Sequence, residues 1–135
     1  INSEGDVFNN EVLEVNFNNC IIYGSQNIEL LIEQLDDSNL NYKFNNCLLK
    51  FSDINGSFNT PTYNFENEEH FENLVLNQDP DFISPYENNM IIGVNSAGKN
   101  QGDQFFSNLI PFDLLNIDRT INPDLGAYQH VIQED

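Results

Sequence analysis

A six-residue pattern that returns at a fixed offset constrains this chain more than any other feature. Phe17-Asn18-Asn19-Cys20-Ile21-Ile22 recurs as Phe44-Asn45-Asn46-Cys47-Leu48-Leu49, and a looser copy begins at Phe71, each 27 residues after the last. Repeats of roughly 20–50 residues indicate units that stack on one another. The apolar runs are too short for helices and are typical of strands. The spacing therefore predicts parallel strands stacked as coils, with Phe17, Phe44 and Phe71 at equivalent positions.

Asparagine is unusually frequent, with 24 among the 135 residues. Its side chain bonds the local backbone in turns, and it tolerates the left-handed backbone conformation. Equivalent asparagines in stacked units also form ladders. We expect Asn19, Asn46 and Asn73 to occupy equivalent turns and to stack. Disorder is the competing interpretation, and the 11 phenylalanines and 5 tyrosines argue against it.

The two cysteines, Cys20 and Cys47, occupy equivalent positions in the repeat. They should be neighbours on adjacent coils, so distance alone leaves a disulfide open. We favour two packed free thiols, because in-register parallel neighbours seldom present the required Cβ geometry and a free cysteine packs as a small apolar residue. Two cysteines and two distant histidines are too few for a zinc site. The redox state of the pair stays open.

The chain is strongly acidic, with 22 acidic and 4 basic residues and a net charge of −18. Nucleic acid binding requires clustered lysine and arginine and is therefore not expected. An anionic membrane surface is disfavoured by the same repulsion, whereas cations such as Ca²⁺ are favoured partners. No apolar run approaches the roughly 20 residues that a membrane-spanning helix needs, so we expect no transmembrane segment.

From residue 77 the repeat gives way to a series of short motifs. The motif residues are Asp79, Pro80, Phe82, Ser96, Ala97, Asn100, Gly102, Asp113, Arg119 and the run Asp124-Leu125-Gly126-Ala127-Tyr128. In this order they resemble the C-terminal coils and cap of bacterial right-handed parallel β-helix proteins with the pectate-lyase-like fold. Asn116 stands where that family commonly has glycine, and asparagine can supply the same left-handed backbone.

The resemblance and the repeat together predict an all-β, right-handed parallel β-helix. Residues 1–76 would form the coils, and residues 77–135 would form the last strands and a C-terminal cap of the same domain. The apolar residues of 110–117 would cover the open end of the last coil. The expected structural residues of the cap are Asp113, Arg119, Asp124, Gly126 and Tyr128. Arg119 would pair with Asp113, Asp118 or Asp124, the alternative being an arginine that binds a substrate.

The resemblance implies a secreted or cell-surface protein on the outer face of a Gram-negative bacterium. No catalytic residues are identified, because the few lysines (Lys43, Lys50 and Lys99) and the histidines His70 and His130 lack a motif partner. We expect a non-catalytic segment that is structural, adhesive or carbohydrate-binding, with polysaccharide or the remainder of a larger β-helix or surface assembly as partner. The alternative is the C-terminal part of a polysaccharide lyase or glycoside hydrolase whose active site lies upstream.

Exposed aromatic residues are the candidates for carbohydrate contacts, namely Tyr42, Tyr63 and Tyr86. No cofactor is expected apart from Ca²⁺, for which the loop acids Asp79, Asp81 and Asp103 are weak candidate ligands because Ca²⁺ prefers oxygen donors. No EF-hand pattern supports such a site, and solvated loop acids are the alternative interpretation.

Overall fold

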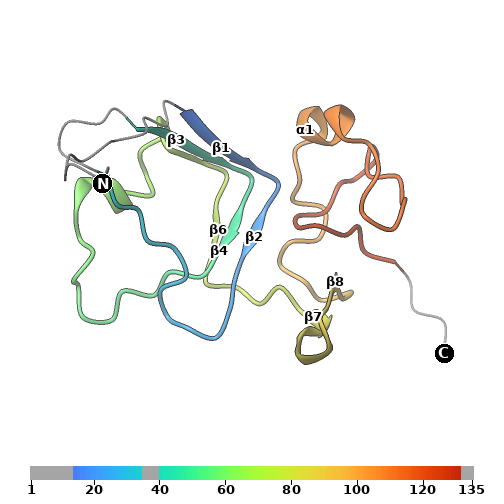
Figure 1. Ribbon diagram of the computed structural model, residues 1–135, viewed down its shortest axis with the longest axis horizontal. Helices are drawn as coiled ribbons and strands as arrows, with labels where there is room; N and C mark the ends of the chain where they lie inside the picture. The colour runs from blue at the N-terminus through green and yellow to red at the C-terminus, as the bar shows by residue number, and fades with distance from the viewer. Residues whose placement is uncertain (1–13, 35–39, 132–135) are drawn as a thin grey trace, which may run out of the picture.

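The computed structural model describes residues 14–34 and 40–131, and within these ranges it contains short strands in three small sheets, two 3₁₀ turns and one short α-helix (Figure 1). Two of the sheets are parallel, and both are built from the repeat. One contains β1 (Glu14–Asn18), β3 (Asn41–Asn45) and β5 (Phe71–Glu72), and the other contains β2 (Ile21–Ile22), β4 (Leu48–Leu49) and β6 (Val75–Leu76).

The register of both parallel sheets follows the 27-residue offset. Phe17 lies opposite Phe44, which lies opposite Phe71. The second sheet pairs Ile21 with Leu48 in the same way. The prediction that the three phenylalanines occupy equivalent positions is confirmed.

The core of the described chain is the stack that this register creates. The ring of Phe44 lies between those of Phe17 and Phe71, with centroid distances of 4.7 Å and 5.5 Å and nearly parallel planes. Phe44 and Phe71 are buried, whereas Phe17 on the outer strand is 36% exposed. Tyr42 packs edge-on against Phe44, because residues two apart on a strand share a face.

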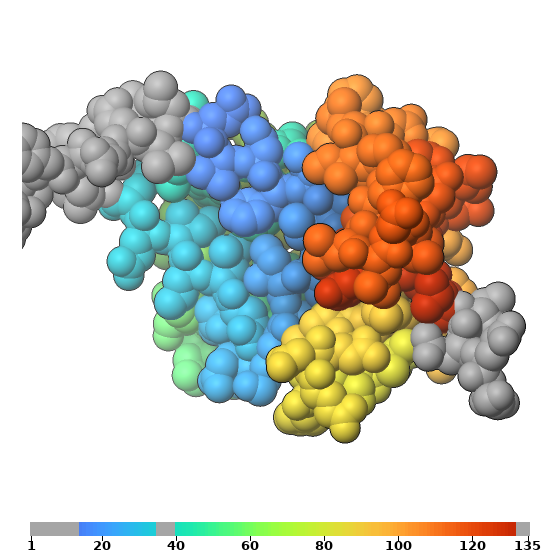
Figure 2. Space-filling view, turned by 45° about the vertical axis from the view of Figure 1, so that its right-hand side comes forward, coloured from blue at the N-terminus to red at the C-terminus, as the bar shows by residue number. Residues whose placement is uncertain are grey.

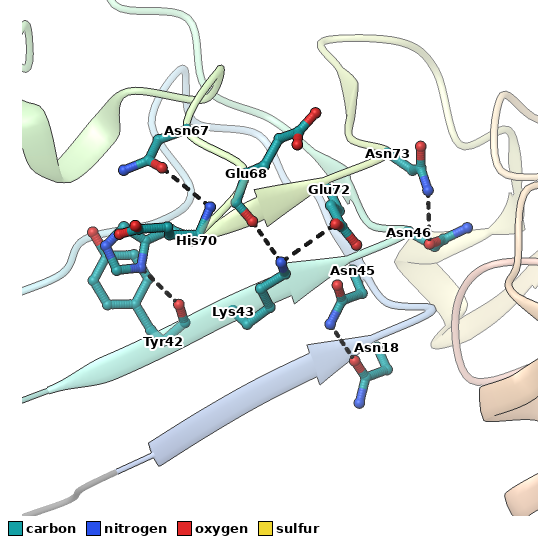
Figure 3. A network of polar contacts seen from close by, with 11 residues as sticks. Asn18, Tyr42, Lys43, Asn45, Asn46, Asn67, Glu68, His70, Glu72 and Asn73 are labelled. Carbon is teal, nitrogen blue, oxygen red and sulfur yellow. Dashed lines mark hydrogen bonds and ion pairs between the residues drawn. The ribbon is translucent and has the colours of Figure 1, made fainter.

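Asparagines turn the chain between the two sheets. Asn19, Asn46 and Asn73 have φ values of 55°, 53° and 53°, the left-handed conformation that the composition predicts. The side chains form only part of the expected ladder, since Asn73 Nδ2 donates to Asn46 Oδ1 at 3.4 Å (Figure 3). Asn19 instead bonds to the C-terminal half of the chain.

The expected right-handed parallel β-helix is wrong for the described residues. A β-helix needs parallel ladders along each side of its coils, and only the two short sheets at the repeat motif provide them. Among its described residues, the segment after β2 makes one antiparallel bridge, from Ile28 to Phe51, and no parallel ladder. The third sheet is antiparallel, and an α-helix follows it. The linking segments differ between repeats, so they cannot stack as the motifs do.

The C-terminal half consists of a hairpin, a helix and irregular chain. Its elements are β7 (Phe82–Ser84), the 3₁₀ turn η2 (Pro85–Glu87), β8 (Asn89–Ile92) and α1 (Gln104–Leu109). The other 3₁₀ turn, η1 (Pro61–Tyr63), lies in the first half, in the linking segment before β5. Within the described ranges no helix is long and apolar enough to cross a membrane.

The C-terminal half packs against the first repeat, next to β1 and β2, as Figures 1 and 2 show. Gly126 N–H donates to Asn19 O at 2.8 Å, and the approach is so close that a Cβ on Gly126 would lie 2.9 Å from Ile21 Cδ1. The prediction that the apolar residues of 110–117 form a lid is wrong, because Ile110 is 68% and Leu114 is 75% exposed. The buried Leu125 packs beside Gly98 instead.

Candidate ligand-binding site

A pocket of about 390 Å³ lies between the end of the first repeat and the antiparallel hairpin. Its lining combines aromatic and apolar side chains with two carboxylates. The side chains used below are Tyr23, Asp79, Asp81, Phe82, Tyr86 and Met90. Small organic ligands bind in pockets of this kind, where apolar walls carry the contact area and a few polar groups set orientation.

The two carboxylates are positioned by a turn around Pro80. Asp79 Oδ1 accepts the N–H of Asp81 at 2.8 Å, which draws Asp81 into the left-handed conformation with a φ of 50°. Asp81 Oδ2 accepts the N–H of Asn95 at 3.2 Å, and Asp81 O accepts the N–H of Gly93. Gly93 is required here because a Cβ would lie 2.2 Å from Asp81 Oδ2. Pro80 is fully buried, so the turn is anchored.

The turn η2 presents Tyr86 to solvent. Pro85 occupies its first position, where a fixed φ suits a helical turn, and Asn88 ends it with a φ of 59°. Tyr86 is 102% exposed, so its ring makes almost no contact within the described chain. An exposed tyrosine on a short, proline-started turn is available for contact with a ligand.

The opposite wall of the pocket comes from the residues that follow β2. Tyr23 is half-buried, and Lys50 Nζ lies 5.3 Å from the centroid of its ring. This cation–π contact holds the tyrosine against the second repeat. The pocket therefore joins one aromatic ring from the repeat with Phe82 and Tyr86 from the hairpin.

The chemistry of this lining suits a saccharide. Aromatic rings offer flat apolar surfaces to the C–H faces of a pyranose, and carboxylate oxygens accept hydrogen bonds from hydroxyl groups. Asp79 and Asp81 each use one oxygen for the backbone bonds above. Among the contacts of the described residues, the second oxygen of each is left for a ligand hydroxyl.

Of the three tyrosines expected to contact carbohydrate, only Tyr86 lies at this pocket. Tyr42 is 9% exposed in the core, and its hydroxyl donates to Thr62 O at 2.9 Å. Tyr63 is half-buried, packs against Phe51 and accepts the N–H of Ile32 at 2.9 Å. Burial removes Tyr42 from contact with a ligand, and Tyr63 does not line the pocket.

The candidate calcium ligands do not converge. Asp79 and Asp81 share the turn described above, whereas Asp103 caps α1 by accepting the N–H of Phe105 at 2.8 Å. Within the ranges that the structure describes, no three His, Cys, Asp or Glu side chains are grouped in a way that could hold a metal ion.

The expected cap residues do lie together, but their contacts are mostly to backbone. Asp113 Oδ1 accepts the N–H groups of Leu115 and Ile117 at 2.8 Å and 2.9 Å. Arg119 Nη2 donates to the carbonyl oxygens of Asp124 and Gly126 at 3.2 Å and 2.8 Å. The expected ion pair of Arg119 with a cap carboxylate is not among the contacts of the described residues.

The remaining cap residues also have structural positions. Asp124 is 1% exposed and accepts the N–H groups of Asn100 and His130, each at 2.7 Å. Gly126 has a φ of 95°, which a side chain would rarely adopt. Tyr128 is half-buried.

Lys43 and the two histidines are engaged in local contacts. Lys43 Nζ lies 3.6 Å from Glu72 Oε1 and donates to Glu68 O (Figure 3). His70 Nδ1 is 2.9 Å from Tyr42 O, and its ring stacks on that of Tyr42. His130 Nδ1 is 2.8 Å from Ile92 O. These contacts give each group a structural role.

Comparison with protein-family models, with curated proteins and with solved structures finds no match to this chain. The assignment of this pocket as a binding site therefore depends on its geometry alone. Sequence reasoning missed Tyr23, Phe82 and Met90 as lining residues. Phe82 was noted only as part of the C-terminal motif series, and Tyr23 directly follows the repeat motif, which indicated strands and not a binding site.

Proposed function

We propose that this chain is a non-catalytic carbohydrate-binding module of a secreted or cell-surface protein. The observation that carries the proposal is the pocket where Tyr23, Phe82 and Tyr86 surround the carboxylates of Asp79 and Asp81. Tyrosine combines a large apolar face with a polar edge, which suits a ligand that is apolar on its ring faces and polar around its rim.

The negative charge of the chain and of the pocket restricts the kinds of saccharide that can bind. The chain carries a net charge of −18, and both polar groups used in the pocket are acidic. Uronic-acid polymers such as pectin and alginate would be repelled. Neutral sugars and amino sugars are the better ligands, because their hydroxyl and ammonium groups donate to carboxylates.

The test is a screen of immobilised oligosaccharides that includes neutral, amino and uronic-acid members, followed by titration calorimetry on those that bind. Neutral or amino sugars should bind. Tyr86→Ala should weaken binding at least about tenfold, equivalent to about 1.4 kcal/mol, without loss of stability because the ring is fully exposed.

Tyr63→Phe is the control, since Tyr63 is a half-buried tyrosine away from the pocket lining. It should leave affinity unchanged. Selective binding of uronic-acid polymers, or full affinity in Tyr86→Ala, would rule out the proposal.

A further inference from the structure

The two cysteines face each other across the parallel ladder. The paired positions Asn18–Asn45 and Ile21–Leu48 bracket Cys20 and Cys47, and Leu48 N–H donates to Cys20 O at 2.9 Å. Parallel neighbours lie about 4.8 Å apart, within the roughly 4.4–6.8 Å Cα separation that a disulfide spans. Both cysteines are free thiols in this structure.

The two thiols differ in their accessibility to solvent and to small reagents. Cys47 is 0% exposed and belongs to the core cluster around Phe44. Cys20 is half-buried and lines a second pocket, of about 510 Å³, between the first repeat and the C-terminal half. A reagent in that pocket can reach Cys20, whereas it can reach Cys47 only through Cys20.

The surroundings favour a thiolate at Cys20. The neighbouring Cys47 thiol lowers the pKa of Cys20 to about 7, against the opposing effect of burial. The positive charge of Arg119 lowers this pKa further. The neighbouring Cys20 thiol, together with burial, raises the pKa of Cys47. Arg119 lines the pocket with Cys20, and its Nε is buried with no hydrogen-bond partner among the described residues.

We propose that Cys20 and Cys47 form a redox-active dithiol, in which Cys20 attacks a low-molecular-weight disulfide that enters this pocket and Cys47 resolves the product. The Cys20 thiolate forms a bond to one sulfur of the disulfide. The sulfur–sulfur bond of the reagent breaks, and the first thiolate leaves with the electron pair and takes a proton. Cys47 then attacks Cys20 Sγ and forms the new sulfur–sulfur bond. The bond from Cys20 to the second half of the reagent breaks, and that half leaves with the electron pair and takes the proton that Cys47 releases. The two cysteines are oxidised to a disulfide, and the reagent is reduced to two thiols.

The experiment uses the intact chain and cystamine, whose two positive charges favour approach to an acidic protein. Mass spectrometry of the wild-type chain should show an intramolecular Cys20–Cys47 disulfide with no retained adduct, reversed by dithiothreitol. Cys47→Ala should stop at a stable cysteamine adduct on Cys20. Cys20→Ala should leave Cys47 unmodified while the fold persists, because that thiol is buried.

Alkylation with iodoacetamide provides a second readout. In the wild-type chain the rate at Cys20 should be half-maximal near pH 7, and Cys47→Ala should move that midpoint upward because the neighbouring thiol that lowers the pKa is gone. The proposal is overturned if the wild-type chain stays reduced in cystamine, if it keeps a mixed disulfide, or if Cys47 reacts in folded Cys20→Ala as fast as Cys20 does in the wild type.

Discussion

The side chain of Asn19 and the backbone of Asp103, 84 residues apart in sequence, form a reciprocal pair of hydrogen bonds. Asn19 Nδ2 donates to Asp103 O at 3.0 Å, and Asp103 N–H donates to Asn19 Oδ1 at 2.7 Å. Asn19 Nδ2 also donates to Ser107 Oγ in α1, at 3.2 Å. One amide therefore joins the first repeat to the start of the helix.

Asn19→Gly tests this link, because glycine keeps the left-handed backbone and removes only the amide. We expect a loss of about 2–4 kcal/mol in the free energy of unfolding, since buried donors and acceptors lose their partners. Asn73→Gly is the control, because Asn73 is exposed and its only side-chain contact among the described residues is the 3.4 Å bond to Asn46. It should cost less than about 1 kcal/mol.

Urea denaturation measures both changes, and amide hydrogen exchange locates them. Protection should fall first in α1 of the Asn19→Gly variant. Equal losses in the two variants would show that the Asn19 amide contributes nothing beyond its backbone conformation.

The repeat could be predicted from sequence because its side chains are nearly identical at each offset. Pairing Phe17 with Phe44 also pairs every neighbouring residue of the motif, so one register satisfies the whole ladder. The linking segments carry no such identity. Their irregular course, with the single bridge at Ile28, could not be predicted from the motif.

The candidate site was predicted less well, and for reasons that particular residues show. Tyr42 was expected on the surface from its residue type alone. It lies two positions before Phe44 on β3, and it therefore shares the core face of that strand. That alternation was a usable signal. Asp103 could likewise have been identified as a helix N-cap before the apolar pair at 105–106. The pocket itself depends on contacts between segments more than 50 residues apart, Tyr23 and Asp79 among them, which no local pattern encodes.

Asp124→Asn tests the most buried carboxylate of the described chain. Both oxygens of Asp124 accept backbone N–H groups, from Asn100 and His130. An asparagine would turn an NH₂ group toward one of these donors, so we expect a loss of about 2–4 kcal/mol. Glu66→Gln, at an exposed position whose carboxylate makes no hydrogen bond among the described residues, is the control and should change the thermal midpoint little. Comparable shifts in the two melting curves would mean that the Asp124 carboxylate is dispensable.

Thr120 controls the ionisation of Asp118. Its hydroxyl donates to Asp118 Oδ1 at 2.6 Å and its N–H donates to the same oxygen at 2.8 Å, and together these bonds lower the pKa of Asp118. A carboxyl with a lowered folded-state pKa stabilises the protein above its unfolded pKa, and this contribution is lost as pH falls through the folded value. Thr120→Val should raise the pKa of Asp118 toward 3.8, and Thr120→Ser should keep it low. Carboxyl chemical shifts followed by NMR through the acid range measure this, and an unchanged midpoint in Thr120→Val would assign the shift to the backbone N–H alone.

The stacked phenylalanines provide the strictest test of the parallel register. Phe44 is 1% exposed and stacks between two rings, whereas Phe17 stacks on one ring within the described chain. Phe44→Ala should therefore cost about 3–5 kcal/mol, the usual loss when a buried phenylalanine leaves a cavity. Phe17→Ala should cost about 1–2 kcal/mol, because its ring is already partly in water. Phe44→Leu should recover much of the loss, since it refills most of the volume with apolar atoms. Urea denaturation of the three variants gives the comparison. If Phe17→Ala proved as damaging as Phe44→Ala, the middle position of Phe44 in the stack, and with it the 27-residue register, would have to be abandoned.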